Sequence, residues 1–505
     1  MLTLAQLTSA VEGVLATGGD PGTAVQGLHY DSRHIRPGFL FVAIPGHRTD
    51  GHLYLEDAVQ RGATAVVIQK EVALPEGVAW IRVKDSRKAL ADLAARYYGY
   101  PSRRLRLFGV TGTNGKTTTT YLLETLLRRA GRSAGLIGTI VDRLGEKTFP
   151  AEHTTPESLD LQRLLAWMEQ NGAGEVVMEV SSHALALERV RGTEFDVAVF
   201  TNLTQDHLDF HADMDAYFAC KARLFQELGR GVKAGPKYAV INADDPRAGE
   251  LISLTKTPVV TYGFRPEAEV RAENVRVEAT GSTLEIIYSG KRCALRLNLI
   301  GKFNVYNALA AWAVAWQEGL DLNMVARALA EVPGVPGRFE RVDAGQDFTV
   351  IVDYAHTPDG LQNVLQAARQ LTRGKLIVVF GCGGDRDRKK RPLMGEVAAR
   401  GADFCLITSD NPRSEDPEAI INEILPGVER AGAGEYAVEV DRRRAIARAL
   451  ELARAGDTVV IAGKGHETYQ IVQGRVLPFD DRQVAREELE RLGYRKEAGG
   501  SPCSP

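Results

Sequence analysis

Cysteine is scarce in this 505-residue chain, and its five cysteines are scattered without a single Cys-x-x-Cys pair. A disulfide framework or a structural zinc site is therefore not expected, and the pattern is typical of a reducing compartment. No apolar run approaches the ~18 residues that span a bilayer, and the N-terminus lacks a basic start with a long apolar core. We expect a cytoplasmic protein without a membrane partner.

An excess of charge of one sign is also missing. The 62 basic residues nearly balance the 65 acidic ones, which leaves a net charge of −3. Such a balance gives no general attraction to nucleic acid or to anionic membranes, so a nucleic-acid partner is not expected. The length exceeds what one core supports and predicts two to four domains. The composition favours an enzyme.

The strongest motif is a glycine-rich loop between an apolar strand that ends at Val110 and a helix with leucines at helical spacing. The glycines let backbone N–H groups point inward, and the helix adds its positive N-terminal end. The lysine would reach the outer phosphates, and the first threonine would offer its hydroxyl to magnesium. A plain glycine turn is the alternative, because Val110 stands where the strict pattern has glycine. We interpret 111–118 as an ATP cradle that contains Gly112, Thr113, Asn114, Gly115, Lys116, Thr117 and Thr118.

Alternating strand and helix patterns fill three segments and predict an α/β protein. The boundaries follow a Tyr-Pro-Ser break near 101 and a Pro-Gly-rich stretch at 333–337. We expect an N-terminal α/β domain at 1–103, a central domain with a mostly parallel, P-loop ATPase-like sheet at 104–334, and a C-terminal Rossmann-like domain at 335–495. Residues 496–505 are predicted to form a disordered tail.

Two strand ends of the central segment carry candidate catalytic groups. Glu179 interrupts an apolar strand; it either helps to hold magnesium or is satisfied by neighbouring backbone. His207 lies in an Asp/His-rich loop that is either a ligand site or a solvated loop. Lys221 falls on the aromatic face of the next helix. Either its amine reaches solvent, or burial lowers its pKa and leaves an amine that could form a carbamate, a ligand for a second magnesium beside His207.

The third segment has polar loops after four predicted strands, at 353–358, 381–388, 409–413 and 463–467. Parallel strands would bring these loops to one sheet edge, where ligands bind in open α/β sheets. The charges at 385–391 either form a basic mouth for carboxylates and phosphates or are simply solvated. In the helix that starts near 301, Asn304 and Asn307 could bond a base edge or cap the helix.

With these motifs placed, the whole chain resembles the Mur ligase family, most closely its MurE type. The resemblance rests on Asp31-Ser32-Arg33, the loop 112–118, Glu179–His183, Asp206–Asp209, Lys221, Gly301–Asn304, Asp353–Thr357, Asp410-Asn411-Pro412-Arg413 and Gly463–Glu467. It implies an ATP-dependent, ADP-forming ligase that adds meso-2,6-diaminopimelate to the D-Glu of UDP-MurNAc-L-Ala-D-Glu through an acyl phosphate, in cytoplasmic peptidoglycan precursor synthesis. It also implies two magnesium ions, a carbamylated Lys221 and a monomer.

The resemblance assigns each site residue a role. The UDP-sugar would contact Tyr30, Ser32, His47, Arg48 and Thr49, and the muramoyl dipeptide Thr154, Thr155, Ser181 and Arg189. The nucleotide would be bounded by Asn304, Arg338, Asp353 and His356, and the metals held by Thr117, Glu179, His207 and Lys221. The added amino acid would meet Arg386, Asp410, Asn411, Pro412, Arg413, Gly463 and Glu467. His153 and Leu187 stand where some relatives carry Asn and Gln.

Two enzyme alternatives remain, an L-lysine-adding MurE and a folylpolyglutamate synthase. The large N-terminal domain and the Asp410–Arg413 motif speak against the second. A nucleotide-dependent switch without ligase chemistry would leave Lys221 and His207 without a purpose. Because the nucleotide and the amine are expected on different domains, the reaction requires the domains to close about hinges at 101–104 and 333–337.

Overall fold

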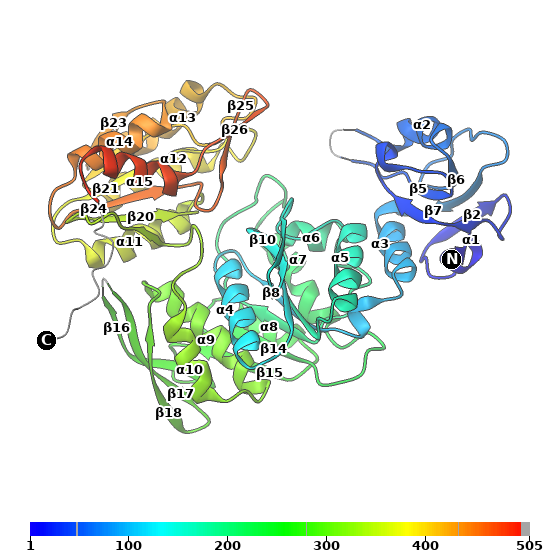
Figure 1. The fold of residues 1–505 in the computed structure, drawn as a ribbon, viewed down its shortest axis with the longest axis horizontal. Helices are drawn as coiled ribbons and strands as arrows, with labels where there is room; N and C mark the ends of the chain where they lie inside the picture. The colour runs from blue at the N-terminus through cyan, green and yellow to red at the C-terminus, as the bar shows by residue number, and fades with distance from the viewer. Residues whose placement is uncertain (47–48, 279, 433, 496–505) are drawn as a thin grey trace, which may run out of the picture.

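The computed structural model describes residues 1–46, 49–278, 280–432 and 434–495, and folds them around three separate large sheets. Figure 1 shows the N-terminal part and the C-terminal part flanking the central part. The predicted tail at 496–505 lies outside the described residues. Within the described ranges, no helix is long and apolar enough to cross a membrane.

The N-terminal part contains a five-stranded sheet in the order β2-β7-β6-β5-β4. Four of its strands are parallel, and β2 pairs antiparallel with β7. Leu159 of the central helix α5 is buried in the same apolar cluster as Leu90 and Leu93 of α3, so the first two parts share a core. The elements are β1 Leu2–Thr3, α1 Leu4–Thr8, β2 Val14–Gly18, β3 Ala24–Val25, β4 Gly27–His29, β5 Phe39–Val42, α2 Leu55–Gln60, β6 Ala63–Ile68, β7 Ala79–Val83 and α3 Ser86–Tyr97.

The central part is built on an eleven-stranded sheet in the order β11-β10-β9-β12-β8-β13-β14-β15-β16-β17-β18. Its strands run parallel from β9 to β16, with antiparallel hairpins at both edges. In β8, Phe108 and Val110 enter one apolar cluster and Leu107 enters the other, as expected for a sheet covered on both faces. The continuous apolar runs in the sequence follow from this double burial.

The strands and helices of the central part have these bounds: β8 Arg106–Thr111, α4 Lys116–Arg129, β9 Ala134–Ile137, β10 Val141–Leu144, β11 Lys147–Pro150, α5 Ser158–Gln170, β12 Glu175–Glu179, α6 Ser182–Ala186, β13 Val197–Phe200, α7 Met214–Glu227, β14 Tyr238–Asn242, α8 Ala248–Leu254, β15 Val259–Gly263, β16 Val270–Glu278, β17 Gly281–Tyr288, β18 Lys291–Leu297, α9 Lys302–Gln317 and α10 Leu322–Glu331.

The C-terminal part has a six-stranded sheet in the order β19-β20-β24-β21-β22-β23, parallel except for β19. The prediction that its four polar loops meet at one edge is confirmed, because each follows one of four parallel strands. The elements are β19 Glu340–Val342, β20 Thr349–Asp353, α11 Pro358–Leu371, β21 Leu376–Phe380, α12 Lys390–Gly401, β22 Phe404–Ile407, α13 Pro417–Ala431, β23 Glu435–Val438, α14 Arg442–Leu452, β24 Thr458–Ala462, β25 Tyr469–Val472, β26 Arg475–Pro478 and α15 Asp481–Arg491.

The predicted α/β class with three sheets is confirmed, but several elements were not predicted. These are the short β10–β11 hairpin, the edge strand β23, the β25–β26 hairpin and the helix α15. Tyr436 in β23 and Val476 and Leu477 in β26 are exposed, so these strands lack the buried apolar run on which the prediction relied.

Candidate active site

The glycine-rich loop lies between β8 and α4, as predicted, at the centre of the largest sheet. Gly112 and Gly115 have φ angles of 146° and 85°, which favour glycine. A Cβ on Gly112 would come within 1.8 Å of the Thr201 hydroxyl, so only glycine fits there. The Lys116 ammonium folds over the loop and donates to the Gly112 and Thr113 carbonyls at 3.0 and 2.7 Å. Burial lowers the pKa of Lys116.

Glu179 ends β12, the strand next to β8, and its carboxylate reaches the start of α4. The Thr117 hydroxyl donates to Glu179 Oε2 at 3.1 Å, and the backbone N–H of Thr139 donates to Oε1 at 2.8 Å. A neighbouring backbone group thus satisfies one carboxylate oxygen, and the other accepts from the hydroxyls of Thr117 and Thr139. Two oxygen atoms suited to magnesium lie side by side here.

Lys221 on α7 does not reach solvent. Only 2% of the residue is exposed, and its ammonium donates to the Gly112 carbonyl at 2.7 Å. Its Nζ also lies 4.5 Å from the centre of the Tyr217 ring. Burial, and after it the neighbouring Lys116 charge, lowers the pKa of Lys221 well below its ordinary value. The structure thus favours the buried alternative and places this amine against the phosphate loop.

His207 follows β13 with a left-handed backbone, φ 56°. Its Nε2 lies 3.2 Å from Asp206 Oδ2, and its ring meets that of His183 edge-on at 4.7 Å. Burial lowers the pKa of His207 to about 3, which keeps the ring neutral and able to bind a cation. Tyr217 connects His207 and Lys221 to the phosphate loop. Its ring lies beside Lys221 and faces the His207 ring at 6.0 Å, and its hydroxyl lies 3.1 Å from the Thr113 hydroxyl.

The candidate nucleotide residues come from both the central and the C-terminal part. Arg338 crosses between them and donates to the Thr117 hydroxyl at 3.0 Å. Asp353 accepts from the Phe339 and Ala355 N–H groups at 2.6 and 2.7 Å, and burial raises its pKa to about 6. His356 Nδ1 lies 2.8 Å from the Tyr354 carbonyl oxygen. These bonds orient the loop after β20 toward the central part.

Neither Asn304 nor Asn307 caps a helix end, because α9 begins after Gly301 without a side-chain cap. Asn304 Nδ2 donates to the Ile300 carbonyl at 2.9 Å, just before α9 begins. Asn307 donates to the Asn304 side-chain oxygen at 3.1 Å and accepts from the Thr119 hydroxyl at 3.4 Å. A Cβ on Gly115 would come within 2.4 Å of Asn307 Oδ1, so this pair borders the phosphate loop.

The four candidate dipeptide contacts are brought together beside Glu179. The Thr155 hydroxyl donates to the Glu179 carbonyl at 2.9 Å and lies 3.3 Å from the Ser181 hydroxyl. Arg189 donates to the Thr155 carbonyl at 3.1 Å. Thr154 accepts from the Thr139 hydroxyl at 3.1 Å. These side chains form one hydrogen-bonded group next to the phosphate loop.

Tyr30 links the N-terminal part to the central part. Its hydroxyl donates to Asp160 Oδ2 of α5 at 2.8 Å, at the wall of a cavity of about 400 Å³. Phe149 and Trp167 meet edge-to-face at 4.8 Å in the same wall, and His153 also lines it. Sequence reasoning missed Asp160, Phe149 and Trp167, because no motif or helical spacing set them apart.

The other predicted UDP-sugar contacts do not line the cavity beside Tyr30 or lie outside the described residues. Ser32 is buried in the turn after β4, and Thr49 Oγ1 lies 3.0 Å from the Tyr54 hydroxyl. Neither residue belongs to the lining of the cavity beside Tyr30. His47 and Arg48 lie outside the described residues.

The loops of the C-terminal sheet enclose the Asp410–Arg413 motif. Asn411 donates to Glu467 at 2.8 Å, and the fully buried Lys464 bonds both of them, at 3.2 Å to Asn411 and 2.9 Å to Glu467. Arg413, with φ 56°, donates to the Gly384 carbonyl at 2.7 Å. Asp410 Oδ2 is buried and finds no hydrogen-bond partner among the described residues, and a Cβ on Gly463 would lie 2.5 Å from it. Lys464 was not among the predicted site residues.

The unpredicted strand β25 holds this motif in place. Gln470 Nε2 donates to the Asp410 carbonyl at 2.6 Å and to the Ser409 hydroxyl at 2.9 Å. The Ile471 N–H donates to Asn411 Oδ1, and the Arg413 N–H to the Ile471 carbonyl, both at 2.9 Å. Arg386 is exposed and donates to the Asp385 carbonyl at 2.9 Å. Most candidate amino-acid contacts are thus held by hydrogen bonds within the protein.

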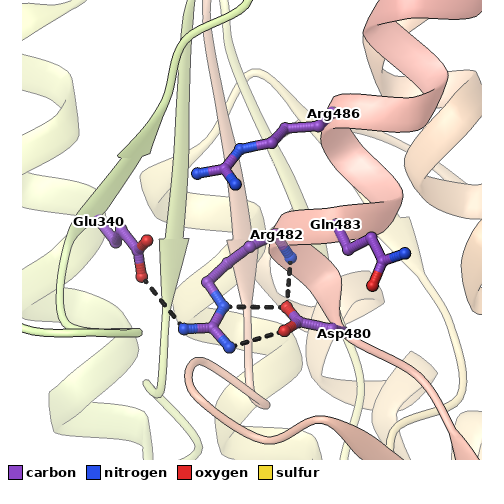
Figure 2. Close-up of a pocket in the computed structure, with 5 residues that line it drawn as sticks. All are labelled: Glu340, Asp480, Arg482, Gln483 and Arg486. Atoms are coloured by element: carbon purple, nitrogen blue, oxygen red, sulfur yellow. Dashed lines mark hydrogen bonds and ion pairs between the residues drawn. The ribbon is translucent and has the colours of Figure 1, made fainter.

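A second cavity, of about 350 Å³, lies at the start of α15 and is lined by none of the predicted site residues. Figure 2 shows Arg482 bridging Asp480 and Glu340, with Arg486 and Gln483 on the same helix. Arg482 also donates to the His466 carbonyl at 3.4 Å. Because the charges of Arg482, Asp480 and Glu340 satisfy one another, we assign this cavity no role.

Comparison with known proteins gives consistent matches along the chain. Residues 24–98 match the model for the Mur ligase family, catalytic domain, residues 110–315 the Mur ligase middle domain, and residues 337–465 the Mur ligase, glutamate ligase domain. A UDP-N-acetylmuramoyl-L-alanyl-D-glutamate--2,6-diaminopimelate ligase from Syntrophomonas wolfei is 51% identical over 92% of this chain and 94% of its own length.

Solved structures of Mur ligases and related enzymes also match this chain. A UDP-N-acetylmuramoyl-L-alanyl-D-glutamate--2,6-diaminopimelate ligase matches with a TM-score of 0.68 and 33% identity, over 97% of this chain and 99% of its own. Folylpolyglutamate synthase from Mycobacterium tuberculosis, solved with ADP and AMPPCP, matches with a TM-score of 0.62 over 81% of this chain and 95% of its own. At 20% identity this second likeness shows the fold alone. By domain content and by identity over nearly its full length, the chain belongs to the Mur ligase family.

Proposed function

We propose that this protein is an ATP-dependent, ADP-forming ligase that joins meso-2,6-diaminopimelate to the D-Glu carboxylate of UDP-MurNAc-L-Ala-D-Glu. The proposal rests on one observation: the candidate ATP loop and the candidate amino-acid loops lie against each other. The phosphate loop of the central part faces the loops of the C-terminal sheet, and Arg338 bonds Thr117 across the junction. The names of the relatives at about 50% identity supply the substrates.

The reaction joins a carboxylate to an amine. A carboxylate is a poor electrophile, so its oxygen first attacks the γ-phosphorus of ATP, and ADP leaves an acyl phosphate behind. The amine then attacks the acyl carbon, phosphate departs and the amine loses a proton. Lys116 and Arg338, both beside Thr117, would neutralise the phosphates that approach the carboxylate. Holding both reactants in one orientation supplies roughly 7–11 kcal/mol of such a barrier.

The donor set fits magnesium at the loop. The Thr117 hydroxyl and the Glu179 carboxylate present oxygen atoms 3.1 Å apart, and hard cations prefer oxygen ligands. Among the described residues there is no group of three or more His, Cys, Asp or Glu that could hold a metal. Phosphate or water would therefore complete the coordination. When bound, magnesium would supply positive charge to the phosphates.

The second metal site would use His207 and a carbamylated Lys221. Carbamate formation requires a neutral amine, and the burial of Lys221 without a carboxylate partner supports one. Carbon dioxide would add to Nζ, which loses a proton and gains an anionic oxygen ligand.

The three ranges 1–103, 104–334 and 335–495 would act as UDP-sugar-binding, ATP-binding and amino-acid-binding domains. The cavity beside Tyr30 and the hydrogen-bonded group around Thr155 would hold the two ends of the UDP-MurNAc dipeptide. Arg413 would clamp the distal carboxylate of diaminopimelate, a role in which its planar fork suits a carboxylate. We further propose that the protein acts as a cytoplasmic monomer.

The test is phosphate release from ATP and magnesium with UDP-MurNAc-L-Ala-D-Glu, comparing meso-diaminopimelate with L-lysine. Release should depend on diaminopimelate and fall sharply in Arg413→Ala, whereas Arg400→Ala, an exposed arginine on α12, should behave as wild type. Equal use of lysine would show that Arg413 is not the selector and favour the lysine-adding alternative. Turnover with neither amine, but with glutamate on a folate, would favour folylpolyglutamate synthase.

A further inference from the structure

One carboxylate of the C-terminal part is bonded directly to the phosphate loop of the central part. Asp359 is the second residue of α11, and its Oδ2 accepts from Asn114 Nδ2 at 2.8 Å and from the Thr204 hydroxyl at 3.1 Å. A third donor, Asn363 Nδ2, lies on the same helix at 3.1 Å. None of the three is a cation, so this contact is a set of directed hydrogen bonds to one oxygen rather than an ion pair.

The backbone of Asn114 is bonded within the central part, and its side-chain Nδ2 is shared between Asp359 and the Thr204 hydroxyl, which accepts at 3.3 Å. The Asn114 N–H donates to Asn202 Oδ1 at 3.0 Å, and its carbonyl accepts from the Thr201 hydroxyl at 2.7 Å and from Asn202 Nδ2 at 3.1 Å. Thr204, the other residue bound by Asp359, donates its N–H to the Thr113 hydroxyl at 3.0 Å. Asp359 therefore holds two consecutive residues of the phosphate loop, Asn114 directly and Thr113 through Thr204.

An equivalent acid on a neighbouring helix shows that helix position alone does not explain Asp359. Glu418 is the second residue of α13, which also begins with proline. A negative charge at this position is favourable in any helix because it faces the positive end of the helix dipole. Glu418 is exposed, however, and among the described residues its carboxylate has no recorded hydrogen bond to the central part. The direction of the Asp359 carboxylate toward the loop is thus specific to α11.

We propose that Asp359 is a positioning residue that couples docking of the C-terminal part to the shape of the phosphate loop. When the C-terminal part docks, Asp359 fixes Asn114 and Thr204, and the loop takes the form in which Lys116 and Thr117 meet the transferring phosphate. When it undocks, the loop loses these ties. The catalytic consequence rests on the proposed function, whereas the mechanical coupling does not depend on it.

The coupling is tested by hydrogen exchange of the ligand-free protein, followed by mass spectrometry. Asp359→Ala should exchange faster than wild type in peptides covering 111–118 and 201–206, because a local tie has been removed. Glu418→Ala, which removes an acid from the same helix position, should leave these peptides unchanged. Unaltered exchange of the loop in Asp359→Ala would overturn the proposal, whatever reaction the enzyme catalyses. Faster hydrogen exchange confined to α11 would also overturn it, because that result would mark a merely structural role for Asp359.

The catalytic consequence is tested by steady-state kinetics with the substrates proposed above. In Asp359→Ala, kcat should fall roughly 10- to 100-fold, the range expected when a hydrogen bond to a charged group is lost. The KM for the UDP-MurNAc dipeptide should stay within about twofold, since its proposed site lies elsewhere. Asp359→Asn should recover part of the loss, because its amide oxygen still accepts from Asn114. If wild type turns over and Asp359→Ala keeps its kcat, the proposal is wrong.

A double-mutant cycle checks that the effect passes through Asn114. If the two residues act through their shared bond, Asn114→Ala combined with Asp359→Ala should lower kcat little more than the larger single loss. A double variant whose loss equals the product of the two single losses would show independent action and contradict the coupling. Absence of turnover in the wild type would instead refute the proposed function, and the exchange experiment would still decide the coupling.

Discussion

Two buried lysines in different sheets have opposite surroundings. Lys464 in the C-terminal part is fully buried and lies 2.9 Å from the Glu467 carboxylate. Lys221 in the central part is 2% exposed; it donates to the Gly112 carbonyl and lies over the Tyr217 ring, and no ion pair to a carboxylate is found among the described residues. A buried lysine beside a carboxylate holds structure through the ion pair, whereas burial disfavours the charged form of an amine. Burial alone therefore does not distinguish the two lysines; the carboxylate bonded to Lys464 does.

Two buried aspartates repeat the contrast. Asp481 in the C-terminal part is fully buried against Arg442, which donates to both of its oxygens at 2.8 and 2.7 Å. Asp142 in the central part lines the cavity beside Tyr30 and accepts from the Gly138 N–H at 3.2 Å. Burial raises the pKa of Asp142 to about 7. Asp481 is thus held by a cation, while Asp142 is a group whose protonation can change.

The largest effect on stability should follow from breaking the buried pair. Arg442→Met leaves the Asp481 carboxylate without its cation, and breaking such a pair costs about 3–5 kcal/mol. Calorimetry should show a C-terminal domain that melts roughly 10 °C lower. The control is Arg442→Met with Asp481→Leu, which removes both charges and should recover much of the loss. A double variant as unstable as the single one would contradict this account.

The next effect concerns activity at the unpaired lysine. Lys221→Ala should lower kcat about 10²- to 10³-fold, the cost of removing one group that stabilises developing charge. Lys221→Arg should be no better, because a guanidinium stays protonated and does not form a carbamate. Enzyme equilibrated with ¹³C-bicarbonate should show a carbamate resonance that both variants lack. Wild-type turnover in Lys221→Arg would exclude the carbamate.

Site residues could be predicted from the sequence where a local pattern determines the surroundings of the side chain. Lys221 was placed on the aromatic face of its helix by Phe218 and Phe225, with burial of its amine as one of two alternatives, and Glu179 was singled out because it ends an apolar strand. The bonds that join the parts were not predictable in this way. Arg338 and Thr117 are separated by 221 positions, and Asn114 and Asp359 by 245. Such contacts depend on how finished domains dock, which neither periodicity nor local motifs encode.

A smaller effect is expected at the unpaired aspartate. Native Asp142 keeps its proton between pH 3.8 and about 7, whereas the unfolded chain releases it there, so stability should fall as pH rises through this window. The pKa difference sets a ceiling of ~4 kcal/mol. Asp142→Asn keeps an acceptor for the Gly138 N–H but has no proton to release. Between pH 5 and 8 the unfolding free energy of wild type should therefore fall relative to that of Asp142→Asn. Parallel pH curves for the two proteins would refute the raised pKa of Asp142.

The smallest effect should come from a charged pair that solvent already surrounds. Arg400 and Glu396 pair at 2.7 Å one turn apart on α12, with 64% of the arginine side chain exposed. Water screens this pair and both side chains are free to move, so Arg400→Gln should change the unfolding free energy by less than about 0.5 kcal/mol. Denaturant unfolding should compare this variant with Arg442→Met in the same domain. Both remove an arginine from an ion pair, but only the Arg442 pair is buried, so the difference in unfolding free energy reports the effect of burial. A loss of several kcal/mol in Arg400→Gln would mean that pairing matters in this protein irrespective of burial, and the contrast between its two buried lysines would lose its basis.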